Sequence, residues 1–167
     1  MTKPNANANG SITIDGDQAT LTFVRRLRYP IDRVWSALTE PSERKAWFGT
    51  TSLEPRQGGT IELDPDDPPV KPELKHMRGR ILSWDPPRLL EHTWQQTIVG
   101  DGVVRYELAQ DGDETILTFS HRGLSVPNAR GFIPGTHAYF DRLAAHLDGQ
   151  PIPSWSDRYA ELVPAYT

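Results

Sequence analysis

Cysteine is absent from the sequence. This absence excludes a disulfide framework, a thiol nucleophile and a thiolate metal site. It is typical of a reducing compartment, and we expect a cytoplasmic protein. No apolar run approaches the roughly 20 residues that a membrane helix needs, so membrane insertion is not expected. Residues 1–10 lack the apolar segment of a secretory signal and are predicted to be disordered.

An excess of positive charge is also missing. The chain carries 18 lysines and arginines against 22 acids, with a formal net charge of −4. Nucleic acids and anionic membrane surfaces attract basic faces, so neither is an expected partner. The hydrophobic content of 37% and the length of 167 residues fit one globular domain. We expect this domain to span residues 11–149, with a tail at 150–167.

Alternation of apolar and polar residues dominates the first two thirds of the chain. Residues 11–14 and 19–29 alternate on either side of Asp15-Gly16-Asp17, which predicts a β-hairpin. Turn signals rich in glycine, aspartate and proline, such as 100–102, separate the later strands. Together they indicate an antiparallel meander. These later strands are predicted at 60–63, 75–84, 89–96, 103–109 and 115–121.

Helical periodicity occurs in two regions. Apolar residues at 31, 34, 35 and 38 share one helical face, and a second short helix is predicted from about Pro41 to Phe48. The long stretch 128–148 is helical in pattern and ends at Gly149. Three aromatic residues in the tail predict that it packs back on the domain, with a helical turn around 157–162.

Several stretches, in this order and spacing, carry a resemblance to a known family. They are 34–41, 47–48, 58–59, 79, 84–89, 93–94, 115–124 and 135–147. The chain resembles the activator-of-Hsp90-ATPase homologues within the START-like, birch-pollen-allergen-like superfamily. The resemblance implies an α+β helix-grip fold, in which a curved antiparallel sheet wraps around a long C-terminal helix. Two short helices follow the first long strand.

The resemblance has one departure. Relatives usually place tryptophan after the helix glycine, where this chain has Thr136. The space under the helix is therefore expected to be larger or more polar than is typical. The eukaryotic activators also have an N-terminal domain with no counterpart in this sequence, so the family name does not imply co-chaperone activity here.

Strand alternation predicts which side chains face the long helix. The chosen inward set is the more apolar one in each strand, namely Leu90, His92, Trp94, Val104, Tyr106, Leu108, Thr115, Leu117, Phe119 and His121. An apolar pocket with a few polar groups is the usual make-up of a small-molecule site. The predicted ligand-binding residues are Trp47, Phe48, His92, Trp94, Tyr106, Phe119, His121, Thr136, Tyr139 and Phe140.

His121 is the strongest candidate for chemistry, with Tyr106 beside it. A neutral imidazole exchanges protons near neutral pH and can act as a general base. The alternative is a core histidine bonded to a backbone carbonyl or to the tyrosine, and His92 has the same two interpretations. The histidine spacing predicts no metal site, and no nucleophile elbow or phosphate loop occurs. No cofactor is expected.

The pattern therefore predicts a binding module for a small hydrophobic or amphipathic ligand rather than an enzyme. One alternative is a cyclase, hydrolase or lyase that uses His121 and Tyr106 on a hydrophobic substrate. A second alternative is a stress- or chaperone-linked interaction module. The sequence leaves a homodimer open.

Overall fold

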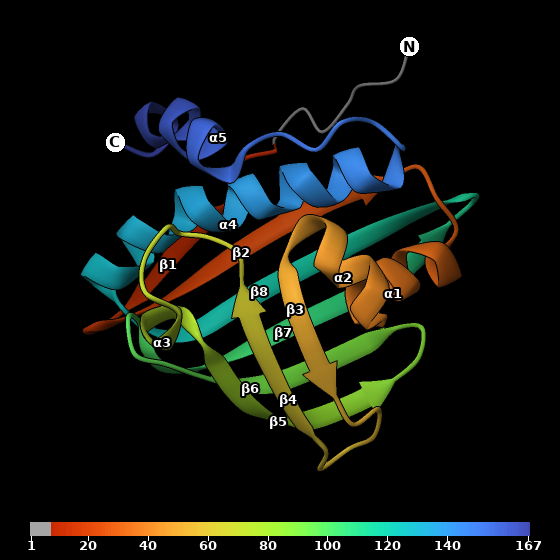
Figure 1. Cartoon of the computed structure of the whole chain (residues 1–167), viewed down its shortest axis with the longest axis horizontal. Coiled ribbons are helices and arrows are strands. Elements are labelled where there is room, and N and C mark those ends of the chain that lie inside the picture. Colours follow the sequence, from red (N-terminus) through yellow and green to blue (C-terminus); the bar gives the residue numbers. More distant parts are fainter. Residues whose placement is uncertain (1–7) are drawn as a thin grey trace.

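A computed structural model describes residues 8–167, and these form one curved sheet around a long helix (Figure 1). The strands are β1 Ser11–Asp15, β2 Gln18–Leu27, β3 Gly49–Leu53, β4 Thr60–Pro65, β5 Met77–Asp85, β6 Leu89–Gln96, β7 Gly100–Asp111 and β8 Glu114–Ser125. The helices are α1 Ile31–Thr39, α2 Pro41–Trp47, α3 Pro72–Lys75, α4 Val126–Leu147 and α5 Trp155–Leu162, followed by a 3₁₀ turn at Val163–Tyr166.

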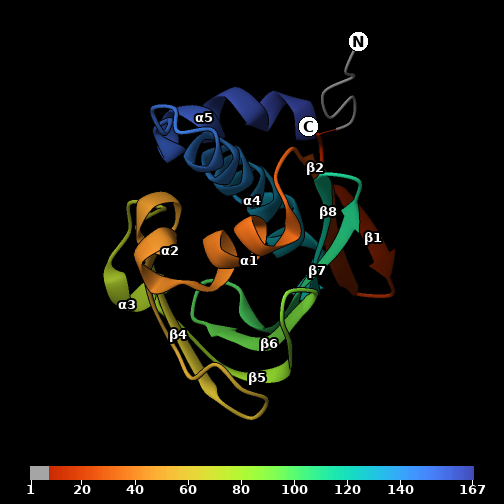
Figure 2. The same cartoon turned by 90° about the vertical axis from the view of Figure 1, so that its right-hand side faces the viewer.

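The eight strands are antiparallel, in the order β1-β2-β8-β7-β6-β5-β4-β3. Figure 2 shows the sheet curving beneath α4, with α1 below that helix inside the curve and α2 on the left. The predicted helix-grip fold is therefore confirmed. No helix among residues 8–167 is long and apolar enough to cross a membrane.

The first hairpin follows from its turn residues. Asp15 pairs with Gln18, and Gly16 takes a φ of 65°, a conformation that glycine adopts without steric cost. β2 then pairs with β8, so the first long strand and the last strand are neighbours. This pairing brings the start of the chain next to the strand that leads into α4.

Two local predictions were wrong, and one strand was missed. Residues 100–102 lie inside β7 opposite residues 94–96, and the turn falls at 97–99 instead. Lys75 ends the short helix α3, so the next strand begins at Met77. The edge strand β3 was not predicted, because five residues that pair only with β4 carry too little alternation to stand out.

The predicted inward faces of β6, β7 and β8 are buried in the structure. α4 covers them and begins at a side-chain cap, in which Ser125 Oγ accepts a hydrogen bond from Asn128 N. α1 packs against β7, β8 and the same helix. The sheet, α1 and α4 thus enclose one core.

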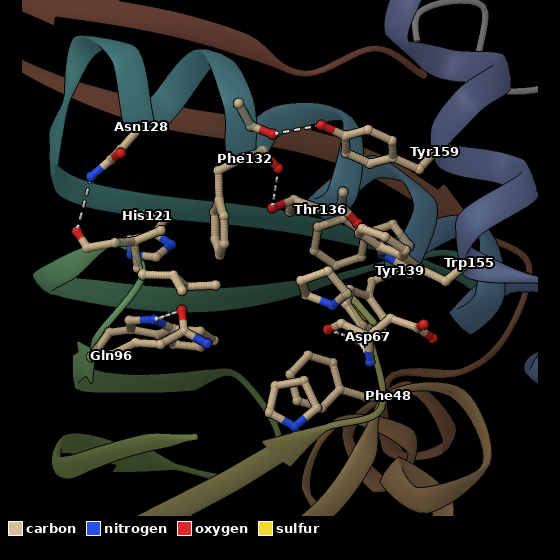
Figure 3. A pocket seen from close by; sticks show the side chains of 18 of the residues that line it. Phe48, Asp67, Gln96, His121, Asn128, Phe132, Thr136, Tyr139, Trp155 and Tyr159 are labelled. Atoms are coloured by element: carbon tan, nitrogen blue, oxygen red, sulfur yellow. Dashed lines mark hydrogen bonds between the residues drawn. The ribbon is translucent and has the colours of Figure 1, made fainter. Parts of the chain in front are cut away.

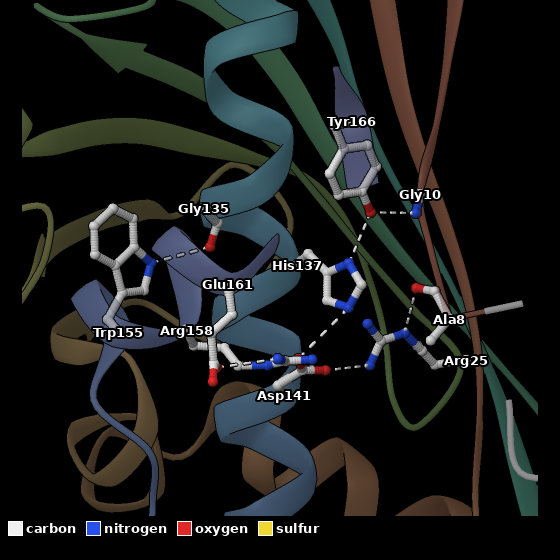
Figure 4. Close-up of polar contacts among 10 residues, drawn as sticks. All are labelled: Ala8, Gly10, Arg25, Gly135, His137, Asp141, Trp155, Arg158, Glu161 and Tyr166. Carbon is white, nitrogen blue, oxygen red and sulfur yellow. Dashed lines mark hydrogen bonds and ion pairs between the residues drawn. The ribbon is translucent and has the colours of Figure 1, made fainter. Parts of the chain in front are cut away.

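The tail forms α5, which lies against α4 on the side away from β5 and β6 (Figures 1 and 2). Trp155 Nε1 donates to the Gly135 carbonyl at 3.0 Å, and a Cβ at Gly135 would lie 2.9 Å from the indole. Arg158 Nε pairs with Asp141 at 2.7 Å (Figure 4). Glycine on α4 therefore permits close docking of the tail helix.

The last turn of the tail also contacts the first of the described residues. Tyr166 Oη accepts a hydrogen bond from Gly10 N at 2.8 Å and contacts His137 Nδ1 at 2.7 Å (Figure 4). Ala8 O accepts a bond from Arg25 Nε at 3.2 Å. The prediction of disorder at residues 1–10 therefore does not describe residues 8–10, while residues 1–7 lie outside the described part of the chain.

Candidate ligand-binding site

A cavity of about 470 Å³ lies between α4 and the sheet (Figure 3). β6, β7 and β8 supply one wall, α4 supplies the other, and the end of α2, the loop after β4 and α5 complete it. The lining residues are Trp47, Phe48, Pro65, Asp67, Pro68, Trp94, Gln96, Ile98, Val99, Tyr106, Phe119, His121, Pro127, Asn128, Gly131, Phe132, Gly135, Thr136, Tyr139, Phe140, Trp155 and Tyr159.

The structure brings together nine of the ten residues predicted to form this site. They are Trp47, Phe48, Trp94, Tyr106, Phe119, His121, Thr136, Tyr139 and Phe140. Seven of them follow from periodicity, because alternation on the strands and the helical repeat on α4 point them at the same space, whereas Trp47 and Phe48 at the end of α2 were expected there from the family resemblance. Figure 3 shows His121 and Gln96 toward one end of the cavity and Phe48 and Trp155 toward the other.

His92 does not line the cavity, so its prediction as a pocket residue was wrong. Its Nδ1 lies 2.9 Å from the Thr93 carbonyl, and its ring lies near those of Trp94 and Tyr106, with centroids 6.1 and 6.4 Å away. Burial lowers the pKa of His92 to about 4. The alternation was correct, but these larger rings occupy the space in front of it.

His121 does line the cavity and packs among aromatic rings. The ring centroids of Trp94 and Phe132 lie 5.2 and 5.4 Å from its own. Its buried Nε2 has no hydrogen-bond partner among residues 8–167. The alternative of a core histidine bonded to a backbone carbonyl or to the tyrosine is therefore not what the structure shows.

Burial sets the charge state of His121. Loss of solvent, with a smaller effect from His92, lowers the pKa of His121 to about 3. The imidazole is therefore neutral at physiological pH and a weak proton acceptor. A general base works best with a pKa near the working pH. His121 suits hydrogen bonding better than proton abstraction.

Most other polar groups of the lining are already engaged. Gln96 accepts from Trp94 Nε1 at 3.1 Å and donates to the Lys75 carbonyl. Tyr139 Oη donates to the Asp67 carbonyl at 2.7 Å, and accepts from the same residue's N–H at 2.9 Å. Thr136 Oγ1 donates to the carbonyl of residue 132 at 3.2 Å. These bonds shape the walls rather than leave groups free for a ligand.

The sequence-based set missed several walls of the cavity. Phe132 precedes Thr136 by four residues and Phe140 by eight, so the helical repeat could have found it. Trp155 and Tyr159 have the same spacing on α5, but no pattern in the tail shows which surface α5 covers. Gln96 continues the inward alternation of His92 and Trp94 on β6, so the strand repeat could have found it, whereas Asp67 lies in a loop that shows no repeat.

Solved structures with the same architecture come from several bacteria. CalU16 from Micromonospora echinospora is 26% identical, with a TM-score of 0.74, covering 95% of this chain and 92% of that one. The product of gene BPP1335 of Bordetella parapertussis is 25% identical, with a TM-score of 0.72 and coverage of 99% and 94%. A conserved protein of unknown function from Enterococcus faecalis is 18% identical, with a TM-score of 0.69 and coverage of 97% and 95%.

The family assignment agrees with the geometry. No curated protein matches the chain in sequence. The family model described as activator of Hsp90 ATPase homolog 1-like protein matches residues 28–148, which include both short helices, the strands that wall the cavity and all of α4. α5 and its two cavity residues lie beyond that match. The chain belongs to the activator of Hsp90 ATPase homolog 1-like family.

Proposed function

We propose that the chain is a binding module for one small hydrophobic or amphipathic molecule, held between the sheet and α4. Residues 11–149 would form the binding domain, and the tail at 150–167 would add a wall. The observation that carries the proposal is a cavity of about 470 Å³ walled largely by aromatic side chains. Such a volume is in the usual range for small-molecule sites, which are mostly apolar with a few polar groups.

The enzyme alternative finds less support. It depends on His121 as a base, and a pKa of about 3 leaves that imidazole with little affinity for a proton. No ion pair or hydrogen bond joins His121 to an acid among the described residues, so a second group that would raise its basicity is lacking. A binding role needs neither feature.

The test uses an uncharged fluorescent probe, N-phenyl-1-naphthylamine, and the substitution Thr136→Trp. Thr136 lines the cavity from α4, so an indole there would occupy the space that a ligand needs. We expect the wild-type protein to bind the probe and to gain about 2.7 kcal/mol of stability at a hundredfold excess over Kd. Thr136→Trp should abolish probe binding and raise the free energy of unfolding by about 1–2 kcal/mol through added apolar burial.

Thr136→Val is the matched control, because it removes the hydroxyl bonded to the carbonyl of residue 132 but keeps the side-chain volume. It should bind the probe as the wild type does. A loss of melting temperature in Thr136→Trp would contradict the proposal, since overpacking a filled core costs about 1–3 kcal/mol. Equal probe binding by the tryptophan variant would also contradict it.

A further inference from the structure

The walls of the cavity hold almost no formal charge. No lysine or arginine lines it, and Asp67 is its single acid. Arg142 and Lys75 lie near enough to Asp67 to favour its ionised form, although burial outweighs them and raises the pKa of that carboxyl. A buried ligand anion would find no cation on the wall and one acid opposing it. A ligand cation would compete with two cations for that acid.

The walls are made of rings rather than aliphatic branches. Ten of the 22 lining residues are phenylalanine, tyrosine or tryptophan, so any ligand is surrounded by π faces and ring edges. The rings come from both layers. The ring centroids of Tyr106 and Phe119 on the sheet are 5.1 Å apart, and that of Phe119 lies 5.0 Å from the ring centroid of Phe140 on α4. Aromatic pairs add about 0.5–1.5 kcal/mol beyond the area they bury. A planar ring system gains from this lining, whereas an alkyl chain gains only burial.

Two polar side chains of the lining make no hydrogen bond within the described chain. No hydrogen bond to a residue of the described chain engages His121 or Tyr106. Val104 pairs with His121 and Tyr106 pairs with Phe119, so the two side chains are diagonal neighbours on the inner face of β7 and β8. Diagonal neighbours lie about 7–8 Å apart. His121 Nε2 is buried beside Gly102, where an added Cβ would lie 3.1 Å from it, so Nδ1 is the imidazole nitrogen left for a ligand. A neutral imidazole and a phenol can each donate or accept a hydrogen bond.

We infer that the ligand of this cavity is an uncharged aromatic molecule whose polar group, such as a hydroxyl or carbonyl, bonds to His121 and Tyr106. The inference rests on the proposed function and names the class of ligand for the same site. The ring body would extend along α4 past Phe132 and Thr136 toward Phe48, in the direction that Figure 3 shows.

The experiment measures displacement of N-phenyl-1-naphthylamine by four compounds of similar size. 2-Naphthol carries rings and a neutral hydroxyl, naphthalene lacks the hydroxyl, 2-naphthoate adds a negative charge, and 1-decanol replaces the rings with an alkyl chain. We expect 2-naphthol to bind at least about tenfold more tightly than 2-naphthoate, because a buried charge without a partner is costly. It should also bind about fivefold more tightly than naphthalene, through one added hydrogen bond, and more tightly than decanol.

Two variants locate the polar contact. His121→Phe and Tyr106→Phe should each lower the ratio of naphthol to naphthalene affinity toward one, while naphthalene itself binds as before. His92→Phe is the matched control, since His92 is buried on the neighbouring strand β6 but does not line the cavity. It should leave the ratio unchanged. Because the readout is a ratio within one variant, a general loss of stability does not imitate it.

The outcomes separate the two proposals. If the probe does not bind and none of the four compounds raises the melting temperature, the proposed function fails and the inference fails with it. If the probe binds but naphthoate or decanol displaces it as well as naphthol does, the inference alone is overturned. An unchanged naphthol-to-naphthalene ratio in both His121→Phe and Tyr106→Phe would likewise overturn the assigned contact.

Discussion

The two halves of α4 cover the same sheet in different ways. Leu143 and Leu147, toward its C-terminal end, belong to a core that includes Val34 and Leu38 of α1. Toward its N-terminal end, Gly131, Phe132, Gly135 and Thr136 face the cavity. α1 packs against β7, β8 and α4, whereas small residues of the helix leave the space under its first half open.

One pair of layers can therefore hold both a core and a binding site. Branched aliphatic side chains interdigitate and fill space to high density. Gly131 and Thr136 place little side-chain volume under the first half of α4, where the cavity lies. The stability of the protein should therefore respond differently to a substitution in the packed C-terminal half of α4 and to one in the N-terminal half that faces the cavity.

Acid should produce the largest effect, and it should act on the cavity half. Burial lowers the pKa of His92 to about 4 and of His121 to about 3, from an ordinary 6.5. The unfolded chain therefore binds more protons than the folded one as the pH falls below about 6.5, and stability decreases towards pH 4. At pH 5 each histidine should cost about 2 kcal/mol, roughly 4 kcal/mol together.

Urea unfolding at pH 7 and pH 5 measures this loss. His121→Phe should reduce the difference between the two pH values by about 2 kcal/mol, whatever its stability at pH 7. Buried His137, whose pKa is also lowered by loss of solvent, contributes in the same direction and remains in both proteins. A variant with the full wild-type pH dependence would show that the cavity half does not carry this sensitivity.

Leu143→Ala should produce the next largest effect, in the packed half. Leu143 is buried in the main core, so truncation removes methyl groups and leaves a void, at a cost of about 2–5 kcal/mol. Thr136→Ala, two turns earlier on α4, borders space that is already open and should cost less than about 1 kcal/mol. Denaturant unfolding of both variants compares the halves directly. Equal losses would remove the distinction between them.

A pair of glycines on α4 should give the smallest effects, with a gain of stability expected at one position and not at the other. Alanine stabilises a helix interior over glycine by about 0.5–1 kcal/mol, and a Cβ at Gly131 would have no atom outside the helix within 4 Å. Gly131→Ala should therefore raise the free energy of unfolding by that amount. A Cβ at Gly135 would lie 2.9 Å from the Trp155 indole, so Gly135→Ala should displace α5. This displacement should cancel the rise in the free energy of unfolding that alanine otherwise gives.

Tryptophan fluorescence and thermal unfolding of the two glycine variants test the docking of α5. Gly135→Ala should change the emission of Trp155, and Gly131→Ala should not. An equal gain of stability in both variants, with unchanged emission, would show that α5 is not held against Gly135 in solution.

Local patterns were enough to predict most of the fold. The hairpin at Asp15-Gly16-Asp17, the first two helices and the inward face of β8 all follow from residues close together in sequence. Steric preference at turns and the strand repeat act over a few residues, so they can be read without a structure. β3 and α3 escaped prediction because each is too short to show a period.

The strand and helix repeats of the sequence were sufficient to predict which faces of the strands and of α4 point inward, and with them seven of the cavity residues; the family resemblance supplied Trp47 and Phe48. Three features depend on how the segments pack together: His92 lies behind the cavity wall near the rings of Trp94 and Tyr106, His121 has no polar partner among the described residues, and Trp155 of α5 forms a wall. The physical reason is that periodicity sets the direction of a side chain. Whether that side chain meets a void or a neighbour depends on volumes contributed by distant segments.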